Sequence, residues 1–117
     1  MQFSREILVL LLLIPSFSSA SGVTYAVNSG FGTGELFLSL SESEQRSYAV
    51  GVINGMLVAP MFGAQKKKMR WFEQCIQNMT DSQVTSILVK FLRDNPGRWH
   101  ETPHVPMFTA LKEACPK

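Results

Sequence analysis

Cysteine and histidine are scarce in this chain, and this limits the metal sites and catalytic sites that it can form. The 117 residues include 2 cysteines and 2 histidines. Two thiols cannot by themselves complete a four-ligand structural zinc site. If the cysteines bond to each other, no thiol nucleophile remains, and no serine lies in the Gly-x-Ser-x-Gly context of a nucleophile elbow. The sequence therefore predicts a protein that is not an enzyme, with no catalytic residues, cofactor or metal.

Strong net charge and strand-like alternation are also missing. With 11 basic and 9 acidic residues, the formal net charge is only +2. That balance gives no reason to expect nucleic acid or an anionic membrane surface as a partner. No segment of the exported part alternates apolar and polar residues with the period of two that marks a half-buried strand. We therefore expect an all-α fold, a small single-domain bundle of four to five helices with one disulfide.

The N-terminus has the features of a secretory signal. Arg5 precedes the apolar run Ile7 to Ile14, and small residues lead to Ala20, where we expect cleavage. The apolar run is much shorter than the roughly twenty residues that a membrane-spanning helix needs. The next residues are rich in glycine and serine. The expected parts are a signal peptide, a flexible leader and a helical domain, at residues 1–20, 21–33 and 34–117.

The strongest helix pattern in the chain runs from Thr80 to Asp94. Thr80 and Gln83 have the spacing of a capping box, in which each side chain binds a backbone N–H of the first turn. Asn95-Pro96-Gly97 supplies residues that end a helix. The apolar positions recur with helical period, and they are Val84, Ile87, Leu88, Phe91 and Leu92. This segment is expected to be the central core helix.

A second helix is expected from a Ser41 cap through Ala59, after one or two helical turns in residues 34–40 that bury Leu36, Phe37 and Leu40. This helix is apolar almost all round and should be buried on several sides. Gly51 and Gly55 are four residues apart and would let another helix approach closely. An alternative is a membrane span followed by Lys66, Lys67 and Lys68, but Asn54 and Pro60 interrupt the uncharged run.

The last helix is expected from Pro103 or His104 to Cys115, with Thr102 as its cap. Its inward stripe would consist of Val105, Phe108, Leu111 and Cys115. Cys75 lies just before the central helix and Cys115 at the end of the last one. In a small exported domain, two cysteines are expected to form a disulfide. Closing this loop would stabilise the fold by about 4 kcal/mol in the loop-entropy model.

A basic run lies in the segment Pro60 to Arg70, which we interpret as a loop. It contains Lys66, Lys67, Lys68 and Arg70. A solvated loop is the simplest interpretation of such a run, and a binding patch is the alternative. Trp71 and Phe72 follow directly. They fit either interface anchors or core residues that hold the segment down.

His100-Glu101-Thr102-Pro103-His104 matches the H-E-x-x-H pattern of zinc metalloproteases. That chemistry needs both histidines on one continuous helix, with the glutamate as general base. Pro103 would disrupt the turn that aligns them. A third histidine would be expected at position 110, which is Ala110. We therefore interpret both histidines as local structural residues rather than as metal ligands.

Taken in order, the motifs of this chain resemble the Rap/Tai family of type VI secretion immunity proteins. The matching fragments are Tyr48 to Gly55, Phe72 to Cys75, Thr80 with Gln83-Val84, Val89 to Leu92, Asn95-Pro96, His100, Ala110-Leu111 and Ala114-Cys115-Pro116. The resemblance implies a periplasmic helical protein of a Gram-negative bacterium that binds a secreted peptidoglycan amidase effector and occludes its active site. Family members carry a further cysteine near Tyr48. Here that cysteine is missing, so a second disulfide is excluded.

The resemblance also directs attention to two surfaces. For effector binding we select the segment with Lys66, Lys67, Lys68, Arg70 and Trp71, because a tight inhibitor needs a rigid scaffold that presents a few anchors. For a possible homodimer we select the face with Gly51 and Gly55. The domain also occurs in exported proteins without a dedicated effector. The alternative function is therefore a periplasmic helper or an acid-stress chaperone-like protein.

Overall fold

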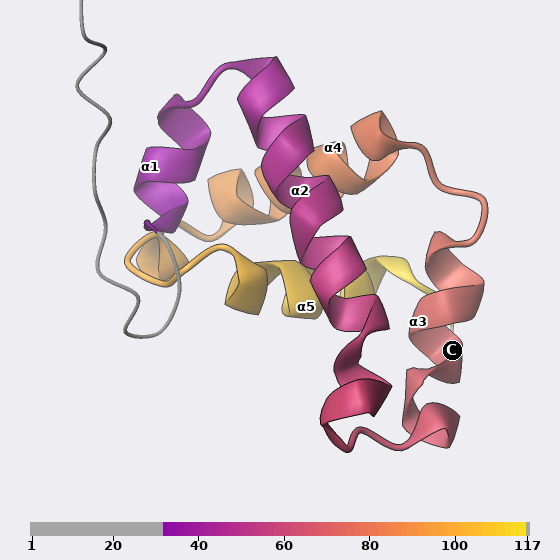
Figure 1. Cartoon of the computed structure of the whole chain (residues 1–117). Coiled ribbons are helices and arrows are strands. Elements are labelled where there is room, and N and C mark those ends of the chain that lie inside the picture. Colours follow the sequence, from indigo (N-terminus) through magenta and orange to yellow (C-terminus); the bar gives the residue numbers. More distant parts are fainter. Residues whose placement is uncertain (1–31, 117) are drawn as a thin grey trace, which may run out of the picture.

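The structure is a computed structural model, and it describes residues 32–116 as a bundle of α-helices and short 3-10 turns (Figure 1). The elements in chain order are α1 Gly34–Ser39, α2 Glu42–Leu57, η1 Ala59–Phe62, α3 Lys66–Ile76, α4 Asp81–Asp94, η2 Pro96–Arg98 and α5 His104–Ala114. No strand occurs in this range. The all-α prediction is confirmed, and the expected signal peptide and nearly all of the leader lie outside the described residues.

The central helix of the bundle is α4, as predicted. It packs against both α2 and α5, and α1 also contacts it. Its capping box is present: the backbone N–H of Gln83 donates to Thr80 Oγ1 at 3.1 Å, and that of Thr80 donates to Gln83 Oε1 at 2.8 Å. Val84, Leu88 and Leu92 are buried on the inner face. The local pattern of this segment therefore determines both its helix and the face that it buries.

Helix α2 begins with a Ser41 cap, as predicted, but the prediction that it is buried on several sides is wrong. Ala49 is its only buried residue, and Val50 and Leu57 are exposed. Figure 1 shows α2 crossing the outside of the bundle, where one face alone meets α4. Its apolar composition is therefore left partly in solvent. None of the described helices has the length and hydrophobicity needed to cross a membrane.

The glycine face of α2 makes no close helix contact within the described chain. A Cβ atom built at Gly51 or at Gly55 would meet no atom within 4 Å. The absence of a side chain at these positions is therefore not required by packing between the described helices.

The loop predicted for residues 60–70 is wrong. Residues 59–62 form the 3-10 turn η1, Gly63 follows with a φ of 100°, and the basic run starts helix α3 at Lys66. The basic run is the start of an amphipathic helix. Its apolar residues recur on the side that faces the core, and they are Met69, Phe72 and Ile76. The lysines occupy the first turn of that helix and are exposed.

Helix α5 is correctly placed, but its inward face was wrongly predicted. Leu111 and Cys115 are buried, whereas Val105 and Phe108 are 42% and 49% exposed. Pro103 and Pro106 are fully buried, and Met107, Ala110 and Leu111 are buried on the same side, so the face with Val105 and Phe108 is turned outward. The cap prediction is also wrong: no side chain caps α5, and its N-cap residue is Pro103 instead of Thr102.

Two glycine substitutions should change stability in opposite directions. At Gly34, a Cβ would lie 3.0 Å from Leu92 Cδ2 and 3.2 Å from Trp99 Cα, so Gly34→Ala should lower the free energy of unfolding by about 1–3 kcal/mol. At Gly55 nothing lies within 4 Å, so Gly55→Ala should raise it by about 0.5–1 kcal/mol through helix propensity. Urea unfolding followed by circular dichroism measures both. Changes of the same sign would contradict this packing.

Candidate functional site

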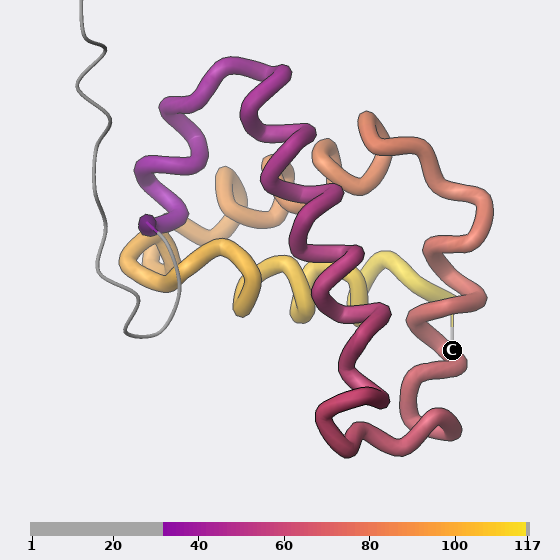
Figure 2. Tube along the Cα trace, in the orientation of Figure 1, coloured from indigo at the N-terminus to yellow at the C-terminus, as the bar shows by residue number. Residues whose placement is uncertain are grey.

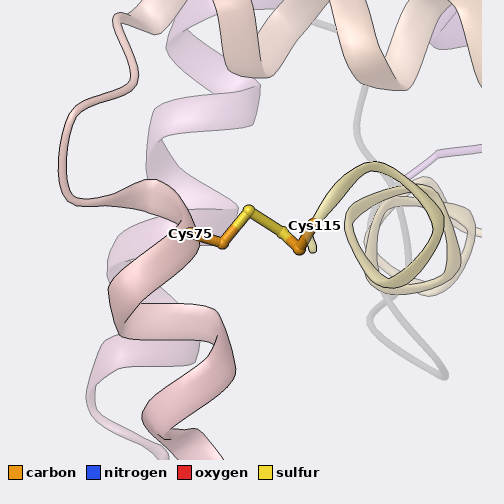
Figure 3. Close-up of a disulfide and its surroundings, with 2 residues drawn as sticks. All are labelled: Cys75 and Cys115. Atoms are coloured by element: carbon orange, nitrogen blue, oxygen red, sulfur yellow. A yellow bond between two sulfur atoms is a disulfide. The ribbon is translucent and has the colours of Figure 1, made fainter. Parts of the chain in front are cut away.

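The disulfide joins the end of α3 to the end of α5. Cys75 and Cys115 are 40 residues apart in sequence, and their Cα atoms are 5.5 Å apart (Figure 3). The predicted pairing is confirmed. Because the bridge connects elements that lie far apart in the chain, it fixes α3 directly to the last helix of the core.

Helix α3 depends on few residues for its position. The tube in Figure 2 shows it to one side of the crossing α2, α4 and α5, and its backbone approaches them less closely than α2 and α5 approach α4. Phe72 is its one buried side chain, at 1% exposure. The Phe72 ring and the Cys75–Cys115 bond are therefore the two principal attachments of α3, and the partly buried side chains of Met69, Trp71 and Ile76 add to them.

An aromatic and cationic cluster bridges α3 and α5 on the outer side of this attachment. The rings of Trp71 and Phe108 meet edge to face, with centroids 5.8 Å apart and an interplanar angle of 80°. Lys112 Nζ lies 4.1 Å from the centroid of the Trp71 ring, a distance at which cation and ring attract each other. Phe108 is therefore half-exposed to solvent but still contacts Trp71 of α3.

In front of this cluster lies a groove of about 840 Å³, which we call the basic groove. We define it by six of the residues that line it, Lys67, Lys68, Arg70, Trp71, Phe108 and Lys112. No carboxylate of the described residues lines it. The two ion pairs of the described residues, Lys90–Asp94 and Arg98–Glu101, lie elsewhere. The four cations of the groove therefore have no ion-pair partner within residues 32–116.

The structure brings together most of the residues that the sequence selected. Lys67, Lys68, Arg70 and Trp71 line the basic groove, whereas Lys66 lies in the same helical turn but does not line it. Sequence reasoning missed Phe108 and Lys112. The signal that could have found them is their spacing of four residues, which places them on one face of α5, but Phe108 was assigned to the core instead.

The basic residues of α3 stand at the unfavourable end of their helix. Lys66, Lys67 and Lys68 occupy its first turn, which has no acidic residue and no side-chain cap. The helix dipole places partial positive charge there, so each cation is destabilising by a few tenths of a kcal/mol to about 1 kcal/mol. Residues that bind a partner often occupy positions where they lower the stability of the fold.

Reversing this charge should stabilise the protein. We expect Lys66→Glu to raise the free energy of unfolding by about 0.3–1 kcal/mol, because a carboxylate is favoured in the first turn of a helix. Lys66→Gln should give an intermediate free energy of unfolding, because it removes the repulsion between the lysine and the helix dipole without adding the attraction of a carboxylate. Urea unfolding at low ionic strength measures the difference. A decrease in stability for Lys66→Glu would show that the lysine has a favourable role in the fold.

The second surface feature is an exposed apolar tip at η1, which we define as Leu57, Val58, Met61 and Phe62. Met61 and Phe62 are 85% and 87% exposed. Figures 1 and 2 show η1 and the start of α3 at the same end of the molecule, away from α4. Apolar side chains that protrude beside lysines are typical of a surface that contacts a partner.

The two histidines are not placed on one helix. Residues 99–103 form a turn, His100 is exposed and His104 begins α5. Glu101 accepts hydrogen bonds from Arg98 Nε and Nη2 at 2.5 and 3.3 Å, and this interaction lowers the pKa of Glu101. Among residues 32–116, no three histidine, cysteine or acidic side chains come together in a way that could hold a metal ion.

The basic groove and the apolar tip thus remain as the features of the described surface that suit recognition. Most of the groove residues lie on α3, which the disulfide attaches to the end of α5, whereas the tip lies at the end of α2 and in η1. No family model, no curated protein and no solved structure matches this chain.

Proposed function

We propose that the protein is a periplasmic immunity protein that binds a type VI secreted peptidoglycan amidase and occludes its active site. The observation that carries this proposal is the apolar tip, which protrudes beside the basic first turn of α3 at one end of a disulfide-bonded bundle. The resemblance of the sequence to the Rap/Tai family adds the class of partner. The disulfide and the N-terminal signal pattern agree with export to an oxidising compartment.

The tip has the properties that an inhibitor needs. Fully covering Phe62 or Met61 would remove apolar surface from water and contribute about 1.5–3 kcal/mol for each side chain. The neighbouring lysines would form the charged rim of such a contact. Pro60 and the short 3-10 turn restrict the tip before binding, so less conformational entropy is lost when the complex forms.

The test is inhibition of peptidoglycan hydrolysis by candidate amidases, beginning with one encoded beside the gene. We expect stoichiometric inhibition by the wild type and a large loss of affinity for a variant with Lys66→Glu, Lys67→Glu and Lys68→Glu. Lys90→Glu on α4 is a control, because Lys90 is exposed but belongs to another surface. Unchanged inhibition by the triple variant would contradict the proposed contact surface.

We also propose that two copies associate through the face of α2 that contains Gly51 and Gly55. In support, both glycines are exposed with open space around them, and Val50 and Val58 are exposed nearby. Replacing Gly55 with glutamate would place a charge in the centre of such an interface. Light scattering should show a dimer for the wild type and a monomer for Gly55→Glu. A monomeric wild type at working concentration would rule out this dimer.

A periplasmic helper without a dedicated effector remains the second candidate, and the exposed apolar tip would also suit contact with unfolded clients. A pull-down from periplasm at pH 7 and pH 3 distinguishes the two functions. An immunity protein should retain one amidase in stoichiometric amount at pH 7. A chaperone-like protein should instead retain many proteins, and mainly at pH 3.

A further inference from the structure

We propose that the basic groove binds an acidic peptide segment that carries an apolar side chain. The identification of this segment as part of the inhibited effector rests on the proposed function, whereas the chemistry of the groove does not. The lining of the groove comes from α3 and α5, together with Met56 of α2 and Ala59 of η1. The groove adjoins the apolar tip but is distinct from it, because none of the four tip residues lines it.

The charge of the groove selects an anionic ligand. Lys67, Lys68, Arg70 and Lys112 line it together, and among residues 32–116 no carboxylate lines the groove and none forms an ion pair with these four cations. The uncapped N-terminus of α3 adds partial positive charge at the same end of the helix. Cations that repel one another without internal compensation are stabilised when carboxylates of a partner approach them.

The aromatic residues of the groove select an apolar group next to the charge. Phe108 is 49% exposed, and its ring packs edge to face on Trp71. Lys112 Nζ covers one face of the Trp71 ring, so an incoming side chain would pack on Phe108 and the remaining surface of Trp71. An aliphatic or aromatic residue between acidic residues satisfies both requirements.

The shape of the groove favours a peptide over a bilayer or a nucleic acid. Trp71 is only partly exposed and Phe72 is buried, so apart from Phe108 the aromatic floor is recessed, and a flat membrane surface would not reach this recessed part. The cations surround one recess instead of forming an extended track along which a phosphate backbone could run. Its volume, about 840 Å³, lies within the range of small-ligand pockets and is sufficient for a short peptide segment.

The experiment titrates the purified protein with a fluorescent peptide that contains about five glutamates around one leucine. The groove variant is Lys68→Gln with Lys112→Gln. The matched control is Lys90→Gln with Arg93→Gln, which makes the same change in net charge at exposed positions of α4 outside the groove. We expect the groove variant to bind at least about tenfold more weakly and the control to stay close to the wild type. The indole N–H signal of Trp71 should shift on binding.

Several outcomes would overturn the proposal. It fails if the peptide does not bind, or if both double variants weaken binding equally, which would indicate diffuse charge attraction. It fails if replacing the leucine of the peptide with serine leaves affinity unchanged, since the aromatic floor would then have no role. Tighter binding of phosphatidylglycerol vesicles or of an oligonucleotide would assign the groove to a membrane or a nucleic acid. Unfolding curves of both variants establish that each is folded.

The link to the effector is tested separately. If an amidase is inhibited equally by the wild type and by the groove variant, the effector does not use this groove and the proposed function stands. If the peptide binds as expected but no amidase is inhibited, the proposed function fails and the peptide-binding groove remains.

Discussion

Replacing both Cys75 and Cys115 with alanine is expected to lower the free energy of unfolding by about 4 kcal/mol. The bond closes a loop of 40 residues, and its removal returns that loop-closure entropy to the unfolded chain. The same bond is one of the two principal attachments of α3. We therefore expect amide exchange to increase in α3 more than in α4, together with loss of the basic groove. Urea unfolding and hydrogen exchange measure these effects.

Reduction of the wild-type protein provides the control for this double substitution. A thiol reductant should reproduce the loss of stability in the wild type and have no effect on the alanine variant. A decrease of less than about 1 kcal/mol would show that packing around Phe72 alone holds α3 in place. Uniform exchange across all helices would show that α3 does not open independently of the core.

Leu88→Ala is expected to destabilise the protein by about 2–5 kcal/mol. Leu88 is fully buried on α4, the helix that packs against both α2 and α5. Truncation removes apolar contacts and leaves a cavity that the surrounding helices can close only in part. Ser86→Ala on the exposed side of the same helix should change stability by no more than about 0.5 kcal/mol.

Denaturant unfolding of the two α4 variants gives a direct comparison. A loss below about 1 kcal/mol for Leu88→Ala would mean that α4 is not the centre of the core. A similar loss for both substitutions would show that burial of Leu88 is not the source of the effect, because alanine is the better helix former at either position and propensity alone would raise stability.

The structure of α4 was predicted correctly from the sequence and that of other segments was not, and both results have the same physical reason. In α4, the capping residues, apolar period and terminating turn all lie within one continuous segment, so local pattern determines the structure. In α3, three consecutive lysines concealed the spacing of Met69 and Phe72, and the segment was taken for a loop. Its helix is stabilised by burial of Phe72 and by a bond to Cys115, and both are tertiary interactions.

The candidate site, too, could be predicted only in part from local sequence pattern. Trp71 was selected from its position beside the basic run, but Phe108 was assigned to the core because helical spacing alone cannot decide which face of α5 turns inward. Burial of Pro103 and Pro106 decides it. The groove consequently combines residues of two helices that only the folded chain brings together. The exposure of Gly51 and Gly55 could not be foreseen either, since it follows from the outer position of α2.

We propose that this protein inhibits a peptidoglycan amidase through the end of the molecule that α3 and η1 form. The most direct measurement is residual hydrolysis of purified peptidoglycan as the protein is titrated against a candidate amidase. We expect complete inhibition at an equimolar ratio by the wild type and little inhibition by the variant with Lys66→Glu, Lys67→Glu and Lys68→Glu. Full hydrolysis in the presence of excess wild-type protein would contradict this proposal.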